Sequence, residues 1–61
     1  MDKIKERFLK AYSDLPEKIR GEIIVLVNDK PFTWNSAYLE IKNDTETGKQ
    51  ILNNLKELGI I

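Results

Sequence analysis

The chain has 61 residues, and its ten Lys or Arg and ten Asp or Glu give a formal net charge of zero at pH 7. The lack of Cys excludes disulfides and thiolate metal sites, and the lack of His removes the commonest general base and metal ligand. The longest apolar run, Ile23–Val27, is far shorter than the ~20 residues that a membrane-spanning helix needs. We therefore expect one cytoplasmic domain over residues 1–61 that is not an enzyme, needs no cofactor or metal and does not contact a membrane.

Residues 2–13 place Ile4, Phe8 and Tyr12 at helical spacing among charged residues. This pattern predicts an amphipathic N-terminal helix, with the rest of the domain over residues 15–61. The apolar stripe on this helix has two possible interpretations. We expect Ile4, Phe8 and Tyr12 to form the interface of a homodimer, and the alternative is that they cover the chain's own core.

The segment from Leu15 to Asn28 has two interpretations. Leu15, Ile19, Ile23 and Leu26 have the spacing of a helix, which we favour. The run Ile23–Val27 is rich in β-branched residues and suits a buried strand equally well. A polar turn follows at Asn28-Asp29-Lys30-Pro31.

Two further helices are predicted after this turn. Thr33 is a candidate N-cap for a helix that begins at Trp34 and reaches Ile41. Asp44 or Thr45 caps the last helix, which ends before Gly59 as its C′ residue. Gly48 lies on the apolar face of that helix, where we expect it to cost ~1 kcal/mol of helix propensity relative to Ala. The apolar stripe of the last helix consists of Ile51, Leu52, Leu55 and Leu58.

From Ile23 onward the chain resembles the winged helix-turn-helix family. The residues that carry the resemblance are the apolar run Ile23–Val27, the entry Pro31-Phe32-Thr33-Trp34 and the ending Leu52-Asn53-Asn54-Leu55-Lys56-Glu57-Leu58-Gly59-Ile60-Ile61. The resemblance implies a mainly α fold, with a three-helix helix-turn-helix core, an extra N-terminal helix and minimal β-structure. Because Ile61 stands where the family's wing begins, it implies a wingless or truncated member.

The resemblance also implies a recognition helix over Thr45–Leu58 and double-stranded DNA as the partner. Gln50 and Asn53 are residue types that pair with adenine edges, and Lys49 reaches guanine or phosphate. Lys42, Thr45 and Thr47 flank the helix start, where they would hold phosphates. The predicted DNA-binding residues are thus Lys42, Thr45, Thr47, Lys49, Gln50 and Asn53, and the predicted function is transcription regulation.

Two alternatives remain open. The first is an α-β-β-α two-layer sandwich, in which residues 22–28 and 32–42 form a hairpin. The second is a protein–protein interaction module, a winged-helix-like adaptor that does not bind DNA. Zero net charge favours the adaptor, because binding to DNA depends largely on neutralising phosphates.

Overall fold

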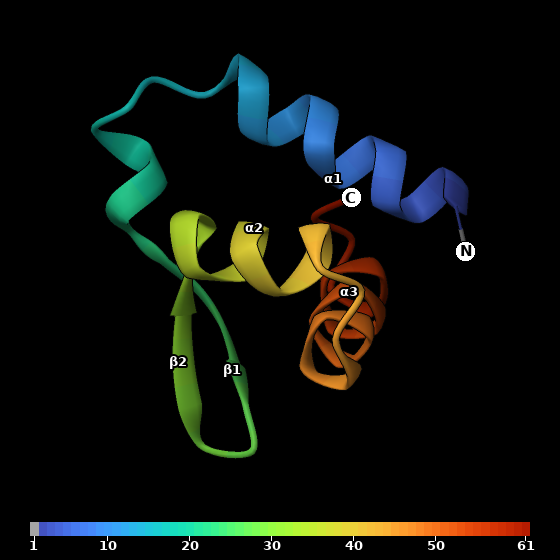
Figure 1. The fold of residues 1–61 in the computed structure, drawn as a ribbon. Coiled ribbons are helices and arrows are strands. Elements are labelled where there is room, and N and C mark those ends of the chain that lie inside the picture. The colour runs from blue at the N-terminus through green and yellow to red at the C-terminus, as the bar shows by residue number, and fades with distance from the viewer. Residues whose placement is uncertain (1) are drawn as a thin grey trace.

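The computed structural model describes residues 2–61, which form a mainly helical chain with a small two-stranded antiparallel sheet. In Figure 1, α1 crosses the top of the view, the hairpin extends at the lower left, α2 lies between them, and α3 lies below α1 to the right of the hairpin. This arrangement confirms the mainly α fold with minimal β-structure. The elements in chain order are α1 (Asp2–Asp14), a 3-10 turn η1 (Ile19–Gly21), β1 (Ile23–Val27), β2 (Lys30–Thr33), α2 (Trp34–Lys42) and α3 (Glu46–Glu57).

The helix favoured for residues 15–28 is wrong, because the end of this segment forms β1. The strand pairs with β2 through a loop of only two residues, Asn28 and Asp29, whose φ angles are 54° and 65°. Positive φ at both positions is the pattern of a type I′ turn, whose twist matches that of the strands it joins. The β-branched run and this turn together favour the hairpin over a helix.

The sandwich alternative is wrong for residues 34–42, which are helical as predicted. Thr33 ends β2 and caps α2 with a reciprocal pair of hydrogen bonds. Its hydroxyl accepts from the Ser36 backbone N–H at 3.0 Å, and the Ser36 hydroxyl accepts from the Thr33 N–H at 2.8 Å. This capping box allows α2 to begin at the residue directly after the end of β2.

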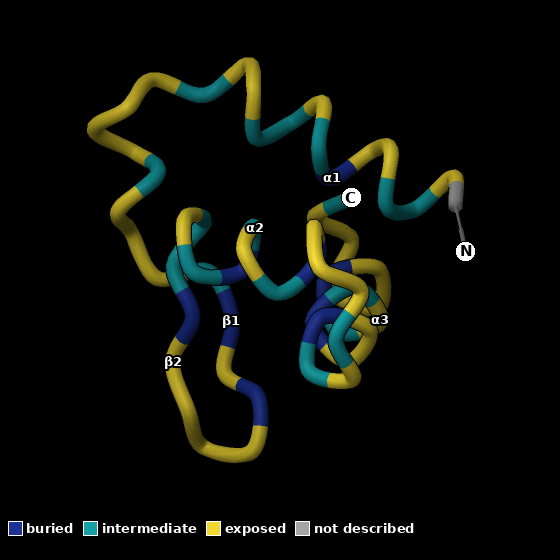
Figure 2. Tube along the Cα trace, viewed as in Figure 1, coloured by how far each residue is buried: buried dark blue, intermediate teal, exposed yellow. Residues whose placement is uncertain are grey.

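The core lies where the inner face of the hairpin meets the three helices, as the dark blue segments of Figure 2 show. Each strand and each α-helix contributes at least one fully or nearly fully buried side chain. The core residues are Phe8, Val25, Val27, Phe32, Ala37, Ile41, Ile51 and Leu55.

An aromatic cluster attaches α1 to α2. Phe8 is completely buried, and its ring stacks on Trp34 with 5.5 Å between centroids. Tyr12 stacks on Tyr38 at 4.3 Å, and its hydroxyl donates to Asn35 at 2.6 Å. Phe8 and Tyr12 therefore cover the chain's own core, the alternative to the expected dimer interface, and Ile4 is half-buried on the same helix.

The end of α3 is closed by its glycine as predicted. Gly59 has a φ of 76°. Its N–H donates to the Lys56 carbonyl at 3.0 Å, and the Ile60 N–H donates to the Leu55 carbonyl at 2.9 Å. These two bonds form a Schellman motif, which turns the chain back so that Ile61 packs against the core.

Gly48 marks the closest approach of α2 and α3. A Cβ atom at this position would lie 2.5 Å from the carbonyl oxygen of Glu40 and 2.7 Å from its carbonyl carbon. These are backbone atoms of α2, which a side-chain rotation cannot move away. Gly48 is therefore required by the helix crossing, and its low helix propensity is the smaller effect.

We predict that Gly48→Ala lowers the free energy of unfolding by about 1–3 kcal/mol, as overpacking in a core does. Gly21→Ala is the matched control, because a Cβ there meets nothing within 4 Å. Urea denaturation of both variants measures the difference. If Gly48→Ala instead stabilised the protein by the ~1 kcal/mol that helix propensity favours, the close crossing would be wrong.

Candidate nucleic-acid interface

Helices α2 and α3 form a helix-turn-helix unit. The connection consists of Asn43, Asp44 and Thr45, and α3 runs nearly along the line of sight in Figure 1 while α2 lies across it. Asp44 adopts a left-handed conformation with a φ of 54°, which bends the chain sharply after α2. The unit thus projects α3 steeply away from α2.

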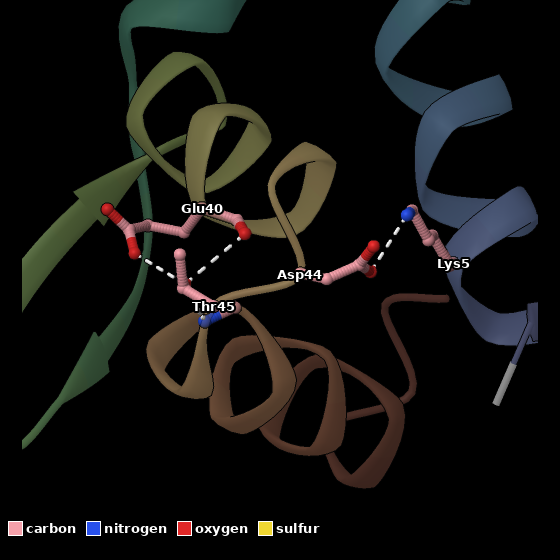
Figure 3. A network of polar contacts seen from close by, with 5 residues as sticks. Lys5, Glu40, Asp44 and Thr45 are labelled. Atoms are coloured by element: carbon pink, nitrogen blue, oxygen red, sulfur yellow. Dashed lines mark hydrogen bonds and ion pairs between the residues drawn. The ribbon is translucent and has the colours of Figure 1, made fainter.

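The hydroxyl of Thr45 holds the turn together, as Figure 3 shows. It accepts from the Gly48 backbone N–H at 2.9 Å, which caps α3. It also donates to Glu40, with the carboxylate oxygen at 2.6 Å and the carbonyl oxygen at 3.2 Å. Both the donor and an acceptor site of this hydroxyl are used within the chain, so Thr45 acts as a helix cap.

An ion pair links α1 to the same turn. The ammonium of Lys5 lies 2.8 Å from a carboxylate oxygen of Asp44 (Figure 3). The Asp44 side chain is largely exposed, so the pair contributes only ~0–1 kcal/mol. Its effect is to neutralise one carboxylate next to the start of α3.

One face of α3 is exposed as predicted. Lys49, Gln50 and Asn53 are all exposed, and the opposite face, with Gly48, Ile51 and Leu55, is buried. Of the remaining predicted contacts, Lys42 is exposed at the end of α2, and Thr47 is half-buried in the first turn of α3. The structure therefore brings Lys49, Gln50 and Asn53 together on one surface, with Thr47 on the same helix. The Lys42 ammonium instead lies 5.8 Å from the centre of the Tyr38 ring, which stacks on Tyr12 of α1. Glu46 and Glu57 are exposed on α3.

The hairpin turn adds a side chain that the sequence pattern does not single out. The amide of Asn28 donates to the side-chain oxygen of Gln50 at 3.4 Å. A shallow hollow of about 290 Å³ lies between the turn and α3. From the sequence, Asn28 could have been assigned to this surface only by predicting that the hairpin turns at Asn28 and packs against α3. The residues that line the hollow are Val27, Asn28, Gln50, Asn53, Asn54 and Glu57.

The chemistry of this surface is that of amides. Asn and Gln each carry two N–H donors and a carbonyl acceptor, so they form paired hydrogen bonds with a planar partner such as a base edge. We call the group Asn28, Gln50, Asn53 and Asn54 the amide cluster. Among the side chains described, those of residues 3–61, no three Asp or Glu come together in a group that suits a metal ion.

No family model, curated protein or solved structure gives a significant match to the chain. None of the helices in the described residues has the length and apolar character needed to cross a membrane. The geometry of the exposed α3 face is therefore the basis for a functional hypothesis.

We predict that Thr45→Val lowers the free energy of unfolding by about 0.5–2 kcal/mol through loss of the cap. Thr47→Val makes the same change two residues along the same helix, where the hydroxyl caps no helix end. We expect its effect to stay within ~0.5 kcal/mol. Thermal or urea unfolding of the two variants tests the assignment, and equal losses of stability would show that Thr45 is not the cap.

Proposed function

We propose that the chain binds double-stranded DNA through the exposed face of α3 and regulates transcription in the cytoplasm. The observation that supports this proposal most strongly is the amide cluster, three members of which lie on a helix that projects from a helix-turn-helix unit. An exposed helix of this kind fits the major groove, where amide side chains pair with adenine. The tip of the hairpin would contact the DNA beside it.

The charges near α3 make binding by one copy weak. Lys42, Lys49 and Lys56 are exposed and attract phosphates, whereas Glu46 and Glu57 repel them. The balance leaves few net positive charges for the DNA backbone. Specific contacts by the amide cluster must therefore supply a larger share of the affinity than in a basic DNA-binding domain.

The second candidate is a protein–protein interaction module that uses the same face. The observation in its favour is that Glu46 and Glu57 accompany the lysines, which suits a mixed-charge protein surface. The salt dependence of DNA binding distinguishes the two functions. A DNA-binding protein loses affinity steeply between about 50 and 200 mM salt. Lys49→Ala would then reduce the slope by about 1.

We predict that Gln50→Ala combined with Asn53→Ala lowers the affinity for a preferred DNA sequence by about tenfold for each bidentate hydrogen-bond pair that it removes. Affinity for unrelated duplexes is expected to change little, so the sequence preference disappears. A selection from randomised duplexes supplies the preferred sequence, and fluorescence anisotropy measures the affinities.

Glu17→Ala combined with Lys18→Ala is the control, because both residues are exposed in the segment before η1 and the net charge again stays at zero. This control should bind like the wild type. If the Gln50/Asn53 variant also bound with unchanged affinity and preference, α3 would not be the recognition helix. If the wild type bound no duplex at low salt, the interaction module would be favoured.

A further inference from the structure

The two outer edges of the sheet differ in their ability to pair with a further strand. Val27 and Lys30 flank the two-residue turn, and Val25 pairs with Phe32. In an antiparallel ladder, hydrogen-bonded pairs alternate with pairs that are not hydrogen-bonded to each other. The pairs Val27–Lys30 and Val25–Phe32 are hydrogen-bonded, so Leu26 and Pro31 between them direct their backbone groups to the two outer edges of the sheet. Pro31 has no N–H, and this closes the outer edge of β2 to a further strand.

The outer edge of β1 is open. Leu26 is 64% exposed, and it forms no backbone hydrogen bond outside the ladder within residues 2–61. The register of the ladder shifts between Ile23 and Val25, so Leu26 is the residue of β1 whose backbone faces outward in a regular part of the strand. The N–H and carbonyl group of Leu26 therefore remain available to another strand. In Figure 1 this edge lies on the side of the hairpin nearest α3.

An apolar groove of about 510 Å³ runs along this open edge. Its walls are β1 and the end of α3, and among the described residues Glu57 is the only ionisable one that lines it. Three large apolar side chains there, Ile23, Leu26 and Leu58, are each 63–64% exposed. The groove is lined by Ile23, Ile24, Val25, Leu26, Asn54, Glu57 and Leu58.

We propose that this groove is the interface of a homodimer, in which β1 pairs antiparallel with β1 of a second copy. The two hairpins then form one four-stranded sheet around a two-fold axis. Pairing satisfies the open N–H and carbonyl group of Leu26 in both copies. It also buries the exposed side chains of Ile23, Leu26 and Leu58 from each side.

The occupant is a second copy because the surface is self-complementary. Each copy supplies both an apolar strand with a free edge and an apolar groove to receive one. The zero net charge gives two copies no overall repulsion, and no basic residue of the described range lines the groove to select a charged ligand. A stable interface covers ~800 Å² on each partner, about a fifth of this chain's 4361 Å² of surface.

The size of the core supports the same conclusion. Over residues 2–61, only eight hydrophobic residues are buried, and a chain this short gains little stability from such a core. Six large apolar residues of the same range remain exposed, and the groove collects three of them. Dimerisation through β1 would cover these three residues and extend the core.

The test measures mass by light scattering after size exclusion, across a range of protein concentrations. We expect the wild type to reach twice the monomer mass at high concentration. Leu26→Lys, which places a charge at the strand edge, is expected to remain at the monomer mass. Leu39→Lys is the matched control, because Leu39 is 57% exposed on α2, away from the groove, and this variant should dimerise like the wild type.

Amide hydrogen exchange on the wild type provides a second readout that needs no variant. The Leu26 N–H is expected to exchange slowly at concentrations where the dimer forms and rapidly after dilution. A wild type that stays monomeric at all concentrations would overturn the proposal. The same holds for a monomer whose groove binds an unrelated extended peptide. It also holds for a dimer in which Leu26 exchange does not change, or for one that persists in Leu26→Lys.

Discussion

The close contact between Gly48 and the backbone of Glu40 is the constraint on which the rest of the fold depends. The absence of a side chain lets α3 cross α2 closely, and the Thr45 hydroxyl that caps α3 also contacts Glu40 at the end of α2. This crossing directs Ile51 and Leu55 into the core and leaves Gln50 and Asn53 outside. A wider crossing would separate α3 from the hairpin and open the core.

Much of the helical structure follows from local signals in the sequence. The caps at Thr33 and Gly59 involve atoms only a few residues apart, so the residue types identify them. The sequence leaves the cap of the last helix open between Asp44 and Thr45, and the structure uses Thr45. Ile23–Val27 is ambiguous in the sequence, because five apolar residues fit a strand and a helix equally well, and only pairing with β2 decides between them. Helix propensity alone understates the role of Gly48, because its contact with Glu40 depends on how two helices pack.

Part of the candidate site also follows from local spacing in the sequence, and part depends on tertiary packing. Helical spacing predicts the exposed row of Lys49, Gln50 and Asn53, but Asn28 reaches Gln50 only because the hairpin folds toward α3. The apolar stripe of α1 is ambiguous for a related reason, since burial within a chain and burial against a partner leave the same pattern. The amide hollow and the apolar groove share Asn54 and Glu57, so the proposed DNA face and the proposed dimer interface are neighbours on α3.

The most direct test of the proposed interface is an NMR titration of the isotopically labelled protein with short duplex DNA. We expect the largest shift changes on the side-chain amides of Asn28, Gln50 and Asn53 and on the Lys49 backbone. Residues of α1 should stay unchanged. Changes spread evenly over the lysines of all three helices, or no change in the amide cluster, would contradict a specific nucleic-acid interface on α3.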